Sequence, residues 1–144
     1  MWTWLLVRSS HSPASGWSHI EYITAANDFG VHDLKYADLG ANLRSKGGDG
    51  YTPIGPRLIN VADIDVHDIT LSTWVNGELR QDTTTSDMIF PVAELVAYAS
   101  QVFPLEPGDV ITTGTPPGVG MGKKPVAQFL RPGDVMTLGI EKLG

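Results

Sequence analysis

The sequence predicts a mainly β protein, a mixed β-sandwich roll or barrel-like fold with one main helix near residues 91–102. Three observations predict it. Short apolar segments follow one another with Gly and Pro between them, an Asn-Gly pair joins two segments of alternating hydrophobicity, and only one stretch shows a helical repeat. Many short strands divided by turn residues are typical of sheets that fold over on themselves. The 144 residues are enough for one domain with a buried core.

The first nineteen residues are expected to form an atypical and disordered leader. Three of the four tryptophans fall in this stretch, beside Ser, His and Pro residues without a clear period. Chain ends are where disorder concentrates. The folded domain is therefore expected to cover residues 20–144, with residues 1–19 dispensable for it.

The strands expected next follow from runs of apolar and β-branched residues. One strand is expected over residues 22–27 and another over residues 57–61. Residues 71–75 alternate in the way of a strand that is buried on one face, and the pair Asn76-Gly77 then supplies the turn that a tight hairpin prefers. Residues 78–83 are the returning strand.

One helix is expected, followed by two further strands. Pro91 suits a first helical turn and Pro104 ends the helix. Between them, apolar residues recur with helical spacing at Val92, Leu95, Val96 and Ala99. Pro-Gly-Asp turns at residues 107–109 and 132–134 each precede an apolar strand.

Composition excludes several functional classes. The formal net charge is −6 with only ten Lys and Arg residues, whereas a nucleic-acid groove requires clustered positive charge. No apolar run approaches the roughly 20 residues of a membrane-spanning helix. The chain contains no Cys and no G-x-S-x-G motif, so covalent acyl-enzyme chemistry is not supported. We expect a cytoplasmic protein without nucleic-acid or membrane partners.

Four segments in a fixed order carry a resemblance to a known family. They are AANDFGVHD at residues 25–33, LRSKGGDGYTPIGP at 43–56, VNGELRQDTTTSDMIF at 75–90 and GDVITTGTPPGVG at 108–120. Together they resemble the fumarylacetoacetate hydrolase family over about residues 22–144, which implies the fold of that family's C-terminal catalytic domain. The FGVHD and RSKGGD variants are similar to the branch of 2-hydroxyhepta-2,4-diene-1,7-dioate isomerases and 5-oxopent-3-ene-1,2,5-tricarboxylate decarboxylases.

The resemblance also implies a set of site residues. Asp28 matches the aspartate that contributes to a divalent metal site, usually Mg²⁺ or alternatively Mn²⁺. Lys46 matches a catalytic lysine that contacts a substrate oxygen. Thr115, next to Gly114 in the Thr-Gly-Thr turn, matches the position that anchors the substrate carboxylate, and the turn is suited to close backbone approach to an anion. His32 stands at a substrate-binding position where many members carry arginine.

These residue types suit the chemistry that the resemblance implies. Magnesium prefers carboxylate, carbonyl and water oxygens, and a β-diketone or 2-oxo acid would chelate it through two oxygens. The metal would then stabilise an enolate as it forms, and a lysine ammonium would add positive charge beside the same oxygen. Such an enolate leads to C–C hydrolysis, isomerisation or decarboxylation.

On the residues alone, each assignment has a structural alternative. Asp28 after Asn27 is also what a turn at the end of a strand would carry. Lys46 beside two glycines is also what a solvated loop would carry, since lysines are mostly exposed. Thr115 is also an ordinary residue at the end of a strand, and His32 is also an ordinary packed or surface histidine.

Two functions therefore stay open. The first is a magnesium-dependent enzyme acting on acylpyruvate-like or oxo-dienoate acids in aromatic compound catabolism, working as a homodimer through exposed sheet edges. The second is a truncated, catalytically silent β-domain that serves as a binding or subunit-interaction module. The second is considered because the family's Glu-x-Glu metal pair lies upstream of the Asp28 segment, whereas Glu21 is the one acidic residue before Asp28. The domain at residues 20–144 is therefore expected to be incomplete and to bind magnesium weakly.

Overall fold

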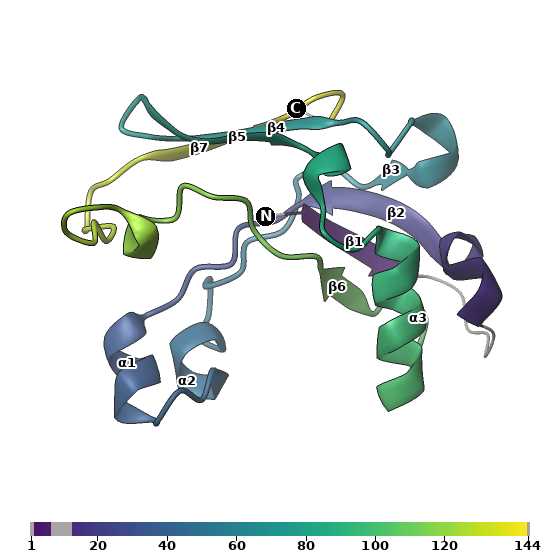
Figure 1. The fold of residues 1–144 in the computed structure, drawn as a ribbon, viewed down its shortest axis with the longest axis horizontal. Coiled ribbons are helices and arrows are strands. Elements are labelled where there is room, and N and C mark those ends of the chain that lie inside the picture. Colours follow the sequence, from purple (N-terminus) through teal and green to yellow (C-terminus); the bar gives the residue numbers. More distant parts are fainter. Residues whose placement is uncertain (1, 7–12, 144) are drawn as a thin grey trace.

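The protein folds into two antiparallel sheets. The computed structural model describes residues 2–6 and 13–143. The four-stranded sheet has the order β3-β2-β1-β6 and the three-stranded sheet the order β5-β4-β7 (Figure 1). The first sheet contains β1 (Trp2–Leu6), β2 (Ile20–Ala25), β3 (Ile59–Asn60) and β6 (Val110–Thr112). A mainly β fold with one main helix is confirmed.

The three-stranded sheet is built around the predicted hairpin. It consists of β4 (Thr70–Val75), β5 (Glu78–Thr84) and β7 (Met136–Ile140). Asn76 and Gly77 have φ values of 51° and 79°, the left-handed conformation that a two-residue primed turn requires at both positions. The hairpin register shifts between Thr73 and Trp74, because Trp74 pairs with Leu79 while Thr73 pairs with Gln81. Arg80 is therefore the extra residue of a β-bulge.

The core joins both sheets to the main helix. Ile23 of the first sheet, Ile69 and Leu71 are fully excluded from solvent. The predicted helix is α3 (Val92–Val102), which buries Val92 and Val96 in this core. The other members of the cluster are Ile20, Val66, Ile140 and Leu143. Apolar burial of this kind is the dominant favourable term in folding.

The N-terminal segment differs from the disordered leader that we expected. β1 lies between β2 and β6 and pairs with both, and a 3₁₀ helix, η1 (Pro13–His19), follows it. A Cβ added at Gly16 would lie 2.7 Å from the Ala93 Cα, so a glycine is what allows η1 to approach α3. Trp17 packs against the core. Aromatic residues favour strands, which is the signal in residues 2–6 that the expectation overlooked. Residues 1 and 7–12 of the expected leader lie outside the described residues.

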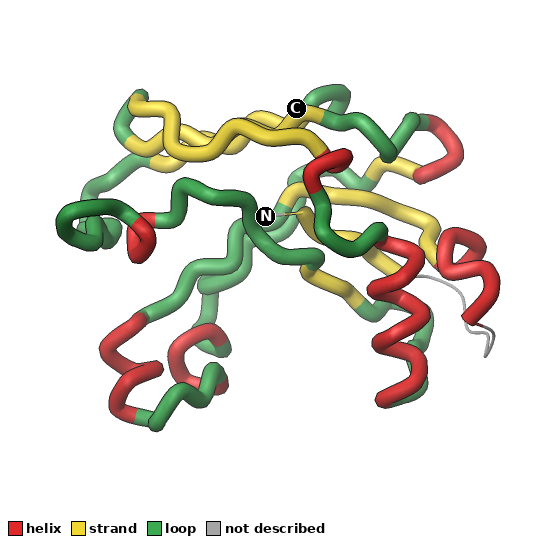
Figure 2. Tube along the Cα trace, in the orientation of Figure 1, coloured by secondary structure: helices red, strands yellow, loops and turns green. Residues whose placement is uncertain are grey.

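Two short helices were not predicted. α1 (His32–Ala37) and α2 (Leu43–Lys46) have six and four residues, too few to show an apolar repeat, and α1 buries no residue. Figure 2 shows both helices at the end of long loops, away from the two sheets. The remaining 3₁₀ helices are η2 (Val61–Asp63), η3 (Thr85–Asp87) and η4 (Gly120–Gly122). Within the described residues, no helix has the length and apolar character needed to cross a membrane.

Candidate active site

Asp28 and Lys46 form an ion pair in which the Lys46 Nζ donates a hydrogen bond to Asp28 Oδ2. The Thr52 hydroxyl lies 3.5 Å from the other carboxylate oxygen, Oδ1. The side chains of Asp28 and Lys46 are 20% and 37% exposed, so the pair is reachable from solvent and yet partly shielded from it. The two residues assigned as metal ligand and catalytic lysine are therefore in direct contact.

Backbone hydrogen bonds hold the two segments of this pair side by side. The amides of Asn27, Phe29 and Val31 donate to the carbonyls of Pro53, Tyr51 and Ser45, at 3.1, 2.8 and 2.9 Å respectively. These alternate donors come from a stretch that continues β2 after its last residue. The Asn27 Nδ2 also contacts the Sδ of Met136 in β7. The Asp28 segment is thereby connected to both sheets.

The Lys46 side chain runs beside Gly30 on its way to the carboxylate. A Cβ added at Gly30 would lie 3.7 Å from the Lys46 Cε, which is ordinary van der Waals contact. The ammonium has three donors and uses one of them for Asp28. The described residues take up neither of the other two donors, which are left for the oxygens of a ligand without loss of the ion pair.

Thr115 and Gly114 lie in the segment between β6 and β7, which contacts β5. Gly114 has a φ of 100°, a left-handed conformation that L side chains rarely adopt. The Gln81 Nε2 donates hydrogen bonds to the Thr115 Oγ1 at 3.0 Å and to the Pro116 carbonyl at 2.9 Å. Gly118, with a φ of 111°, packs so closely on β5 that an added Cβ would lie 2.8 Å from the Arg80 carbonyl carbon. The turn that carries Thr115 is thus fixed to the three-stranded sheet.

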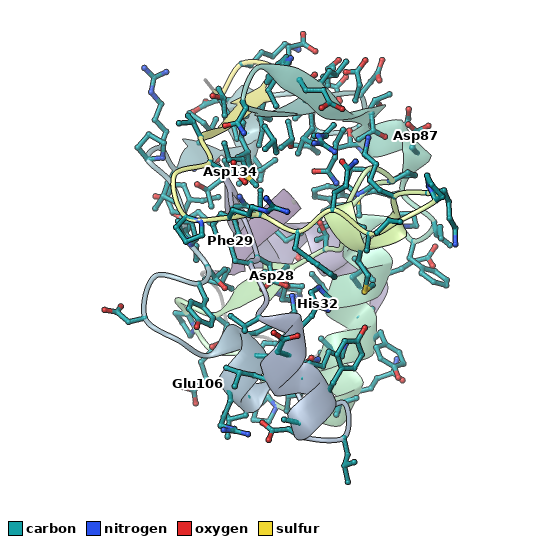
Figure 3. The ribbon with its side chains drawn as sticks, turned by 90° about the vertical axis from the view of Figure 1, so that its left-hand side faces the viewer. Asp28, Phe29, His32, Asp87, Glu106 and Asp134 are labelled. Carbon is teal, nitrogen blue, oxygen red and sulfur yellow. The ribbon has the colours of Figure 1, made fainter. Side chains whose placement is uncertain are left out.

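His32 begins α1 and makes ring contacts. Its ring centroid lies 5.1 Å from that of Phe129 and 6.3 Å from that of Tyr36. Figure 3 shows Asp28 and His32 near the middle of the molecule. Because Phe129 belongs to the same β6–β7 segment as Thr115, that segment contacts both β5 and α1.

The predicted site residues therefore fall into two groups. Asp28 and Lys46 are in contact, with His32 four residues further along the chain. Thr115 and Gly114 form the second group, and no hydrogen bond or ion pair among the described residues joins Thr115 to Asp28 or Lys46. The structure adds three neighbours that the sequence did not indicate, namely Thr52, Gln81 and Phe129.

Gln81 could not have been assigned from the hairpin pattern. A regular two-residue hairpin would set Gln81 opposite Ser72, whereas the bulge at Arg80 sets it opposite Thr73, and a one-residue shift moves a side chain to the other face of the sheet. Gln81 is consequently buried, with 9% of its surface exposed.

The described residues do not make a magnesium site by themselves. Magnesium is usually held by more than one oxygen donor in near-octahedral geometry. The carboxylate of Asp28 is already paired with an ammonium, and within the part of the chain that the structure describes no three His, Cys, Asp or Glu residues cluster in a way that could hold a metal ion. One carboxylate of this kind does not fit the ion.

The family of the chain follows from comparison with known sequences. Residues 7–144 match the family described as fumarylacetoacetate (FAA) hydrolase C-terminal. The chain belongs to the fumarylacetoacetate hydrolase family. The match begins earlier than the expected start near residue 22, so residues 7–21 belong to the family domain rather than to an unrelated leader.

Relatives within the fumarylacetoacetate hydrolase family are enzymes by name. A 2,4-didehydro-3-deoxy-L-rhamnonate hydrolase of Sphingomonas sp. (strain SKA58) is 50% identical over 102 residues, covering 70% of this chain and 36% of that protein. A 4-hydroxyphenylacetate degradation bifunctional isomerase/decarboxylase of Salmonella dublin is 40% identical over 134 residues, covering 92% of this chain and 29% of that protein. The second name confirms the predicted resemblance together with a solved 2-hydroxyhepta-2,4-diene-1,7-dioate isomerase from Mycobacterium marinum, which is 33% identical with a TM-score of 0.83 over 99% of this chain and 53% of that one. Names of enzymes do not favour a silent binding module.

Solved structures of the fumarylacetoacetate hydrolase family share the fold. The fumarylacetoacetate hydrolase of psychrophilic Exiguobacterium antarcticum superposes with a TM-score of 0.92 and 34% identity, over 99% of this chain and 52% of that one. The chain thus spans about half of this solved structure and about a third of the two curated relatives.

Proposed function

We propose that this chain carries the binding site of an enzyme for acids with a 2-oxo carboxylate head, namely acylpyruvate-like or oxo-dienoate acids. The reaction in this proposal is C–C hydrolysis, isomerisation or decarboxylation through an enolate, in aromatic compound catabolism. The observation that carries it is the Lys46 ammonium, which Asp28 holds in a partly shielded position with two donors left over.

The names of the relatives support this substrate class. A 2,4-didehydro-3-deoxy acid has carbonyl groups at C2 and C4 with a methylene between them, which is the skeleton of an acylpyruvate. The isomerase/decarboxylase is named for a different reaction in 4-hydroxyphenylacetate degradation. Both reaction types require negative charge on an oxygen to be stabilised, which a fixed ammonium does well in a partly shielded site.

In this proposal, the residues of the chain have separate tasks. Lys46 donates to the ligand oxygen on which negative charge develops, and Asp28 keeps the ammonium in position. Thr115 donates its hydroxyl to the ligand carboxylate. His32 and Phe129, whose ring centroids are 5.1 Å apart, cover the ligand from the side of α1.

Binding of acetylpyruvate (2,4-dioxopentanoate), measured by calorimetry, tests the assignment of Lys46. Lys46→Met should weaken binding by about tenfold, the loss of one charge-assisted hydrogen bond. Lys35→Met removes the same charge from α1 and serves as the matched control, with an effect below about twofold. Equal affinities of the Lys46→Met variant and the unmodified chain would refute the proposed role. Loss of the acetylpyruvate absorbance on incubation would report hydrolysis.

We further propose that Mg²⁺ or Mn²⁺ binds this chain only weakly. The support is the single carboxylate of Asp28 and its pairing with Lys46. Titration with magnesium chloride should give a dissociation constant of about 1 mM or weaker, at the weak end of hard-cation sites in proteins. Micromolar binding that is lost in Asp28→Asn would show a complete site and contradict this proposal.

Association into a homodimer is also part of the proposal. Leu39, in the loop between α1 and α2, and Leu43, the first residue of α2, are 98% and 84% exposed, and exposed apolar surface favours association. Light scattering at high concentration should report twice the 15.5 kDa of one chain. A single-chain mass at every concentration would contradict it.

A further inference from the structure

The bulge at Arg80 turns the amide of Gln81 toward the turn that carries Thr115. Without the extra residue, Gln81 would lie on the face of Ser72, whose hydroxyl bonds to Asp82 at 2.8 Å on the exposed side of the hairpin. With it, Gln81 shares the face of buried Thr73. Bulges often re-aim one side chain beside a functional site.

The partners of Gln81 decide which way its amide and the Thr115 hydroxyl are oriented. The Gln81 nitrogen lies 2.9 Å from the Pro116 carbonyl, which can only accept a hydrogen bond, so the NH₂ group and not the oxygen faces the turn. The same nitrogen lies 3.0 Å from the Thr115 Oγ1, which therefore accepts as well. A hydroxyl that accepts through a lone pair keeps its own proton for another partner, and the described residues offer no acceptor for it.

The turn is held in this position by more than one contact. Gly118 lies against the Arg80 carbonyl with no space for a side chain. Arg80 donates from its guanidinium to the side-chain oxygen Oε1 of Gln128 at 2.8 Å. The backbone N–H of Gln128 donates in turn to the Gly120 carbonyl at 2.8 Å. Thr115 itself is exposed, while Gln81 behind it is buried. A buried donor behind an exposed hydroxyl is the arrangement that keeps the O–H group directed outward.

We propose that Gln81 is a positioning residue, which holds the Thr115 hydroxyl as a donor for the carboxylate of the ligand. This inference rests on the proposed function, because it takes the ligand to be a 2-oxo acid whose carboxylate binds at Thr115. Gln81 acts through Thr115 in this arrangement and does not itself contact the ligand. It is expected to control the preference for carboxylate-bearing ligands rather than binding in general.

Two probes that differ only in the carboxylate measure this preference. Acetylpyruvate and acetylacetone (pentane-2,4-dione) share the β-diketone, but acetylacetone has a methyl group in place of the carboxylate. We expect Thr115→Val and Gln81→Met each to lower the ratio of their affinities by about tenfold. Gln81→Met introduced into Thr115→Val should not lower the ratio further, because the two substitutions remove the same interaction with the carboxylate. Gln101→Met, which makes the same change at an exposed position of α3, is the matched control and should leave the ratio unchanged.

A second variant, Gln81→Glu, gives a readout that a purely structural role would not change. An ionised carboxylate at this position cannot donate to Thr115 and would instead accept its proton, whereas a protonated one can donate again. The affinity ratio of Gln81→Glu should therefore be low at about pH 7.5 and recover toward about pH 4.5, since burial raises the pKa of a glutamic acid. The unmodified chain, measured in parallel, corrects for the titration of the probes. This variant also carries the test if Gln81→Met fails to fold by circular dichroism.

The possible outcomes separate this inference from the proposed function. If Thr115→Val leaves the affinity ratio unchanged, the carboxylate does not bind at Thr115, and the role of Gln81 fails together with the task proposed for Thr115, while Lys46→Met still decides the proposed function. If Thr115→Val lowers the ratio but neither Gln81 variant does, the proposed function stands and the role of Gln81 fails. Equal weakening of both probes in Gln81→Met, or additive effects with Thr115→Val, would likewise overturn the role of Gln81. A lowered ratio, non-additivity and recovery at low pH together would establish it.

Discussion

The two groups of site residues are held in different ways. Thr115 is fixed to the three-stranded sheet by neutral hydrogen bonds from buried Gln81 and by the close approach of Gly118 to Arg80. Asp28 and Lys46 are held by a partly exposed ion pair beside two short helices, of which α1 buries no side chain. Removal of a partner of a buried polar group costs more stability than the loss of an exposed ion pair. Substitutions around Thr115 should therefore lower the stability of the fold, whereas substitutions of Asp28 or Lys46 should mainly weaken ligand binding.

The largest effect is expected at Gly118. Gly118→Ala places a Cβ against the Arg80 carbonyl at a φ of 111°, so either the turn or β5 must move. We expect a loss of about 3 kcal/mol in the free energy of unfolding, measured by urea denaturation. Gly108→Ala is the control, because Gly108 has a similar φ of 97° but open space around it. If both variants lose the same stability, the close approach of the turn to β5 contributes nothing.

A variant that is destabilised far from both groups of site residues tests whether a loss of stability alone alters the ligand preference. Gly16→Ala sets a methyl group against the backbone of Ala93 in α3, and we expect a loss of about 2 kcal/mol with no change in the preference for acetylpyruvate over acetylacetone. Gly122→Ala, where the added methyl group would meet only a Val119 methyl at 3.8 Å, is the matched control. Unchanged unfolding of Gly16→Ala would mean that η1 does not pack on α3, and the expectation of a dispensable N-terminal segment would be restored.

The parts of the fold that the sequence predicted are those set by neighbouring residues. The hairpin follows from Asn76-Gly77, and α3 follows from an apolar repeat that ends before Pro104. β1 was not predicted because its pairing is non-local. Thr3 lies opposite Thr24 and Thr112, and the sequence of residues 2–6 does not indicate which strands it pairs with. The aromatic content of the segment was its local signal for a strand, and the prediction of a disordered leader overlooked it.

The same distinction applies to the candidate site. The resemblance to the family led to Asp28, Lys46 and Thr115, because these belong to contiguous motifs. Gln81 could not be predicted from the sequence, because its role depends on one extra residue in the hairpin. This bulge reverses the face of every side chain beyond it. The position of a bulge depends on packing between strands, which the alternation of residue types does not encode.

Asp28→Asn is expected to have a smaller effect on stability than either glycine substitution. The ion pair with Lys46 is partly exposed, and such pairs contribute about 1 kcal/mol or less. The measured loss should shrink in about 1 M salt, because ions screen exposed charges. Gln81→Met should show no such salt dependence, since its hydrogen bonds to Thr115 and Pro116 involve no charged group. A salt-independent loss of more than about 2 kcal/mol in the free energy of unfolding of Asp28→Asn would contradict the view that a partly exposed ion pair holds this group.

The smallest effect is expected between the two short helices. Arg44 on α2 donates from Nε to the Asp38 carboxylate after α1 at 2.7 Å, and this bond holds the pKa of Asp38 below its usual 3.8. Because the pKa is lowered on folding, the contact stabilises α1 and α2 above the unfolded pKa and is lost as the pH falls through the folded one. Arg44→Gln should return the pKa of Asp38 toward 3.8, followed by carboxyl NMR, while Arg57→Gln should not. An unchanged Asp38 titration in Arg44→Gln would show that the helices do not depend on this pair.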